Sequence, residues 1–365
     1  MIARSNPLAT PKHIQGYSRD WWRWKASSTQ TIVSLLLSLV LLSGCAKDEE
    51  PLPLFNVPAW FPALPVPADN ALTPARIALG RRLFYEPLLS SDSSKSCASC
   101  HIQVLGFADA NPLAIGVHNR VGLRNSPTLA NIAYVPNLFA EGGVTSLELQ
   151  AQAPIFNPDE MGFTIAGFLD RIAMDATYTA MFEAAYSRAP DAYGISRALA
   201  AFQRTLISGH SRYDAFAYQG DTDALSAAEK RGHDLFFSSA TQCSQCHTPP
   251  LFSTMDYANI GLYTTYADSG RARLTSLPQD NGKFRIPTLR NVALTAPYMH
   301  NGSMSTLTEV VAHFNSGGVS HSNKSDLIKP LNFTTAQQAD LVAFLGALTD
   351  EGFVVNPDFG APKID

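Results

Sequence analysis

A five-residue motif, Cys-x-x-Cys-His, occurs twice in this sequence. Its members are Cys97, Cys100 and His101 in the first copy and Cys243, Cys246 and His247 in the second. Two thiols at this spacing can each bond one vinyl group of a single porphyrin, and the histidine that follows can bind its iron. A zinc site or a disulfide is the alternative for a Cys-x-x-Cys pair, but neither explains a histidine after both pairs. In an exported chain the motif predicts two covalently bound c-type haems, each with a proximal histidine ligand.

The fifth cysteine, Cys45, belongs to a predicted export signal. Three basic residues precede an apolar run over residues 32–42, and a Leu-Ser-Gly sequence leads directly into Cys45. This order resembles a bacterial lipoprotein signal peptide. A membrane-spanning anchor is the alternative, but the run is shorter than the roughly 20 residues that a helix needs to cross a bilayer. We therefore expect a signal peptide over residues 1–44 and a periplasmic protein held by lipid on Cys45. Ala46, rather than an aspartate, in the next position favours the outer membrane.

The charge of the chain argues against some classes of partner. The sequence of 365 residues has 27 basic and 31 acidic residues and a formal net charge of −4. The charged residues of the signal peptide are mostly basic, so its removal makes the net charge of the mature chain more negative. This balance makes nucleic acid an unsuitable partner and suits a basic or dipolar electron-transfer partner. A hydrophobic content of 45% is enough for the packed cores of two domains of roughly 150 residues each.

An ordered set of sequence landmarks occurs in both halves of the chain. Before each motif a predicted helix closes with Leu-Phe, and after each motif a Pro-Thr-Leu segment, a glycine and a leucine follow at matching distances. These landmarks are Phe84, 127–133, Gly142 and Leu147 in the first half, and Phe236, 287–293, Gly302 and Leu307 in the second. An ordered series whose last three landmarks, the proline segment, the glycine and the leucine, are separated by equal gaps indicates an internal duplication.

The expected fold is mainly α-helical, with two tandem cytochrome c-like haem domains related by that duplication. Thr73 and Pro74 are typical of the start of the helix before the first motif, and a capping box from Ser226 to Glu229 starts its counterpart. An apolar face over residues 335–348 predicts a closing helix. The expected parts are an anchor arm at 45–70, haem domains at 71–215 and 216–350, and a tail at 351–365.

From Leu72 to Leu348 the sequence resembles the bacterial di-haem cytochrome c peroxidases and their relatives of the MauG type. The matching stretches are 79–84, 124–128, 160–162 and 289–302. The resemblance implies that the N-terminal haem reacts with hydrogen peroxide and that the C-terminal haem receives electrons from a small donor, such as a c-type cytochrome. We therefore expect a peroxidase that reduces hydrogen peroxide to water in the periplasm. A second copy of the chain is a further candidate partner.

The resemblance also assigns roles near the N-terminal haem. Glu160 matches the distal acid of the family, which moves a proton between the peroxide oxygens, and Gln150 matches a second residue of the distal pocket. In the better-known members a distal histidine blocks this iron until reduction frees it. Here that position is Val117, which cannot bind iron, so we expect an open iron without reductive activation. His118 is expected to be a solvated loop residue.

At the C-terminal haem the family places a methionine or tyrosine as the distal ligand, and the matching residue here is Phe314. Phenylalanine offers no donor atom. Either this iron is five-coordinate, or its ligand is Met304, His313 or Met299, in that order of preference. A thioether ligand would raise the reduction potential, as an electron-accepting haem requires.

Two further expectations concern the region between the haems. The family commonly has a tryptophan where this chain has Ala140, so an indole relay is absent at that position. The family also carries a calcium ion, whose ligand positions match Asn125, Thr295 and Pro297. A side-chain amide oxygen and backbone carbonyls are hard donors that suit calcium.

Two alternative functions stay open. One is a MauG-like oxidase that stores two oxidising equivalents and modifies an aromatic side chain of a partner protein. The open first iron favours it, whereas the missing tryptophan and tyrosine argue against it. The other is a surface-anchored electron carrier without substrate turnover, which two six-coordinate haems would support and Val117 disfavours.

Overall fold

The computed structural model describes residues 56–363. The predicted signal peptide, the predicted lipid site Cys45 and the first residues of the expected arm lie outside this range. The described residues belong to one compact unit. None of the helices in that unit is long and apolar enough to cross a membrane.

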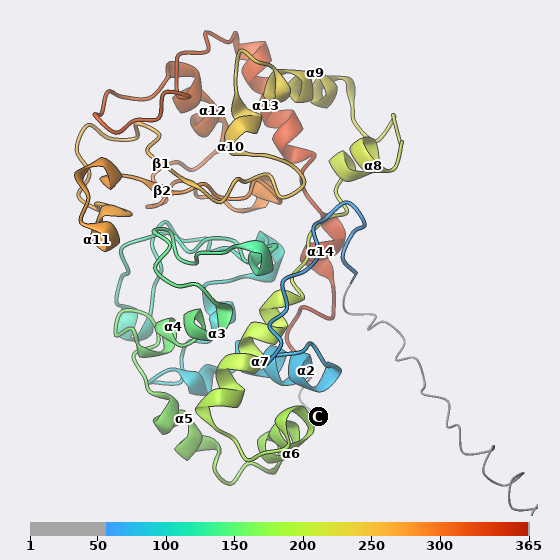
Figure 1. Cartoon of the computed structure of the whole chain (residues 1–365), viewed down its shortest axis with the longest axis vertical. Helices are drawn as coiled ribbons and strands as arrows, with labels where there is room; N and C mark the ends of the chain where they lie inside the picture. Colours follow the sequence, from blue (N-terminus) through green and yellow to red (C-terminus); the bar gives the residue numbers. More distant parts are fainter. Residues whose placement is uncertain (1–55, 364–365) are drawn as a thin grey trace, which may run out of the picture. The chain divides into compact units, whose positions relative to one another are not determined.

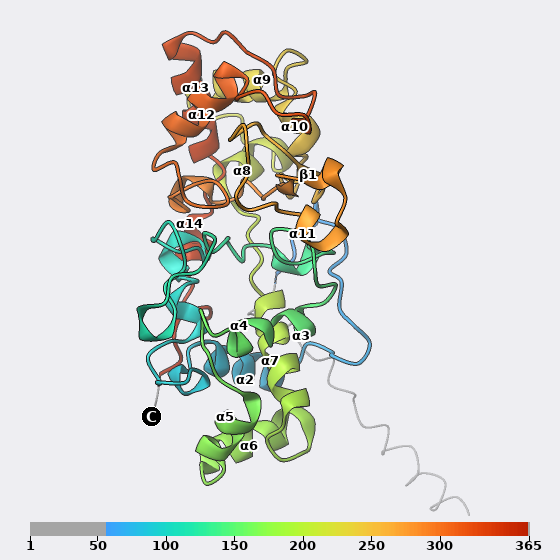
Figure 2. The ribbon, with the colours of Figure 1, turned by 90° about the vertical axis from the view of Figure 1, so that its left-hand side faces the viewer.

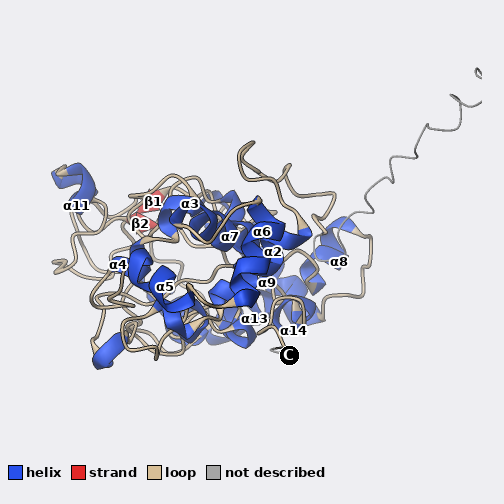
Figure 3. Cartoon of the chain, turned by 90° about the horizontal axis from the view of Figure 1, so that it is seen from below, coloured by secondary structure: helices blue, strands red, loops and turns tan. Residues whose placement is uncertain are grey.

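The described chain is mainly helical, which confirms the expected class (Figures 1 and 3). The first half contains α2 (Pro74–Phe84), α3 (Leu147–Gln150), α4 (Ala153–Phe156), α5 (Ile165–Ile172), α6 (Ala176–Tyr186) and α7 (Ala192–Arg204). The second half contains α8 (Arg212–Tyr218), α9 (Ala227–Phe237), α10 (Cys243–Cys246), α11 (Ala272–Thr275), α12 (Leu307–Ser316), α13 (Thr335–Gly346) and α14 (Glu351–Val355). The strands β1 (Tyr257–Ala258) and β2 (Phe284–Arg285) form a short antiparallel pair.

The helices begin where their capping residues predict. The Thr73 hydroxyl accepts a hydrogen bond from the Arg76 amide at the start of α2, with a proline in the first turn. Ser226 and Glu229 form the expected capping box of α9. A second box at Thr334 starts α13, the predicted closing helix. These caps satisfy backbone amides that have no partner inside the helix.

A close helix pair forms the centre of each half (Figure 2). In the first half α2 packs on α7, and a methyl group added to Gly80 would lie 1.8 Å from the Ala198 carbonyl oxygen. In the second half α9 packs on α13, and a methyl group on Gly232 would lie 2.0 Å from the Asp340 carbonyl oxygen. Both glycines therefore let two helix backbones approach more closely than any side chain allows.

The two halves have separate hydrophobic cores. The first core draws on α2, α5, α6 and α7, and the second on α9, α12 and α13. Phe353, Val354 and Phe359 follow the second half in sequence but pack in the first core. Arg81 holds this returning segment by donating to the carbonyls of Pro357 and Gly360 at 2.6 and 2.7 Å. The segment expected as a tail thus joins the C-terminal end of the chain to the first half.

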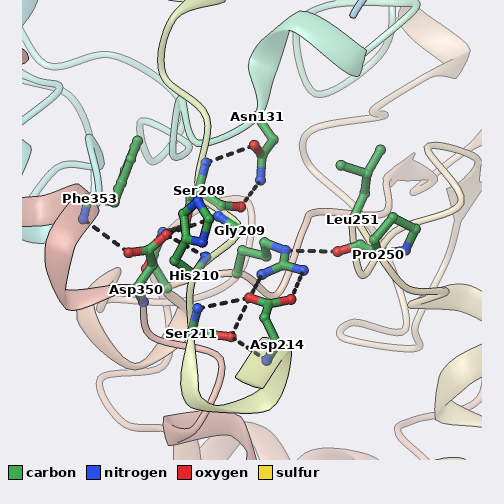
Figure 4. Close-up of polar contacts among 12 residues, drawn as sticks. Asn131, Ser208, Gly209, His210, Ser211, Asp214, Pro250, Leu251, Asp350 and Phe353 are labelled. Atoms are coloured by element: carbon green, nitrogen blue, oxygen red, sulfur yellow. Dashed lines mark hydrogen bonds and ion pairs between the residues drawn. The ribbon is translucent and has the colours of Figure 1, made fainter. Parts of the chain in front are cut away.

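Two buried asparagines, Asn131 (Figure 4) and Asn291, organise the junction between the halves. The Asn131 amide donates to the Leu206 carbonyl, and its side-chain oxygen accepts from the Ser208 amide at 2.9 Å. Asn291 makes the equivalent pair of hydrogen bonds in the second half. Its backbone amide donates to the Leu348 carbonyl, and its side-chain oxygen accepts from the Asp350 amide. Both asparagines have a left-handed backbone, with φ of 59° and 60°. Matching bonds of this kind are what an internal duplication would produce, and the duplication stays a prediction.

Substitution of Gly232 by alanine is expected to destabilise the second half, because the new methyl group meets the backbone of α13. Overpacking of this kind costs about 1–3 kcal/mol. Gly346→Ala, at the end of α13, is the matched control, because no atom lies within 4 Å of the added carbon. The control is expected to be neutral or to stabilise by up to about 1 kcal/mol. Thermal unfolding of the haem-loaded variants measures both, and equal melting temperatures would contradict the proposed helix contact.

Candidate functional site

The two motif histidines are held in the same way. His101 follows the 3-10 helix η2 (Cys97–Ser99), and its Nδ1 lies 3.0 Å from the Phe107 carbonyl oxygen. His247 follows α10, and its Nδ1 lies 3.2 Å from the Phe252 carbonyl oxygen. A proton on Nδ1 shared with a carbonyl leaves Nε2 unprotonated and free for a metal. Burial lowers the pKa of both rings, that of His247 to about 4, and so favours the neutral form that binds iron.

Both motifs line one internal cavity of about 920 Å³. Side chains of both cores form much of its wall, among them Phe84, Leu129, Phe236 and Leu345. The four motif cysteines carry free thiols, and burial raises the pKa of Cys97 to about 12. Within residues 56–363 no group of three or more His, Cys, Asp or Glu side chains is arranged to hold a metal ion. Within the described residues the motifs show neither a disulfide nor a zinc ligand set, and an apolar cavity lined by two thiols and a histidine at each motif fits haem.

Arg285 supplies a second argument that the cavity fits haem. Its side chain lines the cavity, and its Nε donates to the Phe139 carbonyl at 3.3 Å. Burial lowers the pKa of this guanidinium, and no carboxylate of the described chain forms an ion pair with it. A buried cation without a partner is costly. The carboxylate groups of a porphyrin are anions of the kind that Arg285 requires.

Glu160 and Gln150 line the same cavity as His101. The Asn157 side-chain amide donates to Glu160 Oε1 at 2.7 Å, and the Val117 amide donates to the Glu160 carbonyl at 2.8 Å. Burial raises the pKa of the Glu160 carboxyl, and the hydrogen bond from Asn157 offsets part of that rise. The structure therefore places the predicted acid, half-buried and held by Asn157, in the cavity that both motifs line. Its role stays a prediction.

The segment at Val117 closes against the loop that carries Glu160. Val117 is buried, and a methyl group on Gly116 would lie 2.5 Å from the Glu160 carbonyl oxygen. The His118 side chain is 59% exposed and lies 3.5 Å from Asp92. It is not among the residues that line the cavity. A tight backbone contact thus presents Val117 to the interior and turns His118 toward solvent.

The three candidate ligands of the second iron are in different places. Met299 lines the cavity, together with Phe314. His313 directs its Nε2 to the Ile260 carbonyl oxygen at 3.1 Å. Neither His313 nor Met304 is among the residues that line the cavity. This placement favours Met299, the last of the three in the order of preference from sequence.

Ion pairs connect the halves beside Ala140. Arg124 contacts Glu141 and forms a two-point bond to Asp268 at 2.6 and 2.9 Å, and Arg273 contacts Glu141 from the second half. The Arg285 amide donates to the Ala140 carbonyl at 2.7 Å. Ala140 itself lines the cavity. Ala140, which occupies the position of the family's tryptophan, thus contacts the second half through its backbone.

The three predicted calcium ligands all line this cavity. The Asn125 amide donates to the His300 carbonyl, and its Nδ2 donates to the Asn111 carbonyl at 2.9 Å. The hydrogen bond of Nδ2 fixes the side-chain amide in one orientation. The residue types and their shared cavity are compatible with a calcium site, which stays a prediction.

The sequence interpretation missed Arg285 and the ion pairs of Arg124. Arg285 precedes Pro287 by two residues, and Asn125 precedes Pro127 by the same interval. Alignment of the two Pro-Thr-Leu segments would have shown that the second copy has the charged Arg285 where the first copy has Asn125. The partners of Arg124 have no such signal, because Asp268 lies far away in the sequence.

Comparison with known proteins places the chain beside haem enzymes. A family model described as di-haem cytochrome c peroxidase matches residues 74–223. The cytochrome-c peroxidase IdrP1 of Denitromonas iodatirespirans is 38% identical, over 83% of this chain and 88% of the relative. The methylamine utilization protein MauG of Methylorubrum extorquens is 36% identical, over 79% of this chain and 82% of the relative. A solved structure of a MauG-like protein associated with microbial copper homeostasis is 36% identical, with a TM-score of 0.80, over 84% of this chain and 98% of that one.

Replacement of one cysteine pair by serine is expected to remove one of the two haems and leave the other. Cys97→Ser with Cys100→Ser tests the first motif, and Cys243→Ser with Cys246→Ser tests the second. Intact mass and the pyridine haemochrome spectrum measure covalent haem per chain. Cys45→Ser is the control and should keep both haems. A wild-type mass equal to that of the bare polypeptide would contradict covalent attachment.

Proposed function

Because this chain belongs to the di-haem cytochrome c peroxidase family, we propose that it reduces hydrogen peroxide to water with electrons from a small c-type cytochrome or a similar donor. The observation that carries the proposal is the shared cavity of His101, Glu160 and Gln150. Haem bound at the first motif supplies an iron that binds peroxide and accepts electrons. The residues of the chain then position the substrate and move its protons.

Glu160 is proposed to take a proton from one peroxide oxygen and return it to the other. Asn157 holds Oε1 through the bond of 2.7 Å, so the other carboxyl oxygen is left to face the substrate. A carboxyl with a raised pKa accepts and releases a proton more evenly at neutral pH than an exposed one. The Gln150 amide, in the same wall of the cavity, is proposed to hold the second oxygen or a water molecule.

Electrons are proposed to enter through the C-terminal half. Met299 would supply a thioether to the second haem, because it lines the cavity whereas Met304 and His313 do not. The route between the haems is proposed to cross the contact of Arg285 with Ala140. The backbone hydrogen bond from Arg285 to Ala140 lies where the family has its indole.

A MauG-like oxidase is the second candidate. The similarity to MauG and to the MauG-like protein from copper homeostasis supports it, as does Val117 in place of a blocking histidine. In that case the two oxidising equivalents would modify an aromatic side chain of a partner protein. The two candidates share the first step with peroxide and differ in the source of the electrons.

We also propose that the mature protein is held at the periplasmic face of the outer membrane by lipid on Cys45. The support is the signal sequence alone, which precedes the described residues. Metabolic labelling with a radioactive fatty acid, compared between wild type and Cys45→Ser, tests this assignment.

Peroxide mixed with the haem-loaded protein and a prereduced cytochrome c is expected to give repeated oxidation of the donor. Glu160→Gln should lower kcat/KM by about 100-fold or more, because it removes a general acid–base group. The carboxylate must accept the first proton, so wild-type kcat/KM should fall as the pH falls through the raised pKa of Glu160. This acid limb should vanish in the variant. Stopped-flow absorbance of the donor and of the Soret band measures both.

Asp159→Asn is the matched control, since it removes the neighbouring carboxylate, which is exposed. It should keep the activity, and its acid limb should persist but move to a slightly lower pH, because the Asp159 charge contributes to the raised pKa of Glu160. A fully active Glu160→Gln enzyme would remove this residue from the mechanism. A long-lived oxidised spectrum without donor oxidation would favour the MauG-like oxidase, and no response to peroxide would favour the electron carrier.

A calcium ion is proposed at Asn125, Thr295 and Pro297, through one side-chain oxygen and two backbone carbonyls. Treatment with a calcium chelator is expected to lower the melting temperature and change the haem spectra, and added calcium should restore both. Asn125→Ala should make the protein indifferent to the chelator. Metal analysis of the purified protein gives the stoichiometry, and a calcium content of zero with full activity would contradict the site.

A further inference from the structure

Four aromatic rings form a continuous row from the surface to the second haem motif. The Trp60 ring stacks on the Tyr218 ring, with centroids 5.2 Å apart and planes inclined by 10°. Tyr218 meets Tyr213 at 6.0 Å, and Tyr213 meets Phe252 at 4.9 Å. Phe252 is the residue whose carbonyl oxygen lies 3.2 Å from Nδ1 of His247. The row therefore ends at the residue that orients the proximal histidine.

The exposure of these rings changes along the row. Tyr218 is 37% exposed, Tyr213 is 5% exposed and Phe252 is fully buried. Tyr213 and Phe252 belong to the second core, against which Cys243 also packs. An indole and two phenols, the most easily oxidised aromatic side chains, thus lead from solvent into the core that packs against the second haem motif. Trp60 is the only tryptophan in the described part of the chain.

From this row we propose that the Trp60–Tyr218 stack is a surface electron-transfer site, connected through Tyr213 and Phe252 to the haem of the second motif. The proposal rests on the proposed peroxidase function. Electrons would enter the C-terminal half where Trp60, of the expected anchor arm, stacks on Tyr218 at the end of α8. A one-electron reductant, either a small aromatic molecule or a redox protein, would deliver its electron at this stack.

The chemistry of the step balances without a proton transfer at Trp60. One electron leaves the indole for the oxidised haem site, no bond is formed or broken, and the reductant then returns one electron to the indole. Trp60 Nε1 is buried and has no hydrogen-bond partner among the described residues, so its proton stays in place. Reduction of one hydrogen peroxide to two waters needs two electrons and two protons, so the relay operates twice in each turnover.

Hydrogen peroxide added to the haem-loaded protein without a reductant tests the relay. Electron paramagnetic resonance of freeze-quenched samples should show an organic radical at Trp60, and peptide mass spectrometry should find oxygen added at Trp60 or Tyr218. Trp60→Phe, which keeps an aromatic ring in the stack, should shift the radical to Tyr218. The double variant with Tyr218→Phe should shift the radical to Tyr213, and the triple variant that adds Tyr213→Phe should lose the signal.

Tyr193→Phe is the matched control, because Tyr193 is 40% exposed and its ring contacts only Tyr186 among the described aromatic rings. It should leave the radical unchanged. Peroxide consumption is followed in every sample. Consumption by the wild type without a radical or oxidation at Trp60 or Tyr218 would overturn the relay and leave the peroxidase function intact. A wild type that consumes no peroxide would overturn both.

Discussion

The paired asparagine network at the junction is the constraint on which the rest of the structure depends. Asn131 and Asn291 each hold the segment that leaves a core helix, and Asp350 joins the two segments by accepting hydrogen bonds from the amides of Gly209 and His210. Except for the bond from the exposed His210, these hydrogen bonds are buried, so their groups would be costly without their partners. The buried ion pair of Arg290 with Asp214 extends the network into the second half. The network sets how the two halves of one cavity face each other.

Electrostatics then distinguishes the parts of that cavity. Burial keeps both motif histidines neutral, so each can bind a metal. Burial also raises the pKa of Glu160 and leaves Arg285 as a cation without a carboxylate partner. The same desolvation therefore has three consequences, which depend on the charge that each group carries. A cofactor with an apolar ring, a metal and acidic substituents satisfies all three.

The resemblance in sequence identified the family and the mainly helical fold, and both are confirmed. The helix starts at Thr73, Ser226 and in the closing helix were also predicted, because a cap is a contact between residues three positions apart. The return of Phe353 and Phe359 to the first core was not predicted. Nothing near these residues in the sequence indicates a core from the other half, since such packing depends on contacts over more than two hundred positions.

The sequence by itself predicted the attachment chemistry, because the two thiols and the histidine lie within five residues of one another. It also predicted the acid Glu160 through the resemblance to the family. Only the tertiary structure decided which side chains share the cavity: it brought Met299 to the wall, left His313 bonded to Ile260, and placed Arg285 opposite the backbone of Ala140. The physical reason is that burial and long-range contacts arise only when segments far apart in the chain pack together. The row from Trp60 to Phe252 has the same origin.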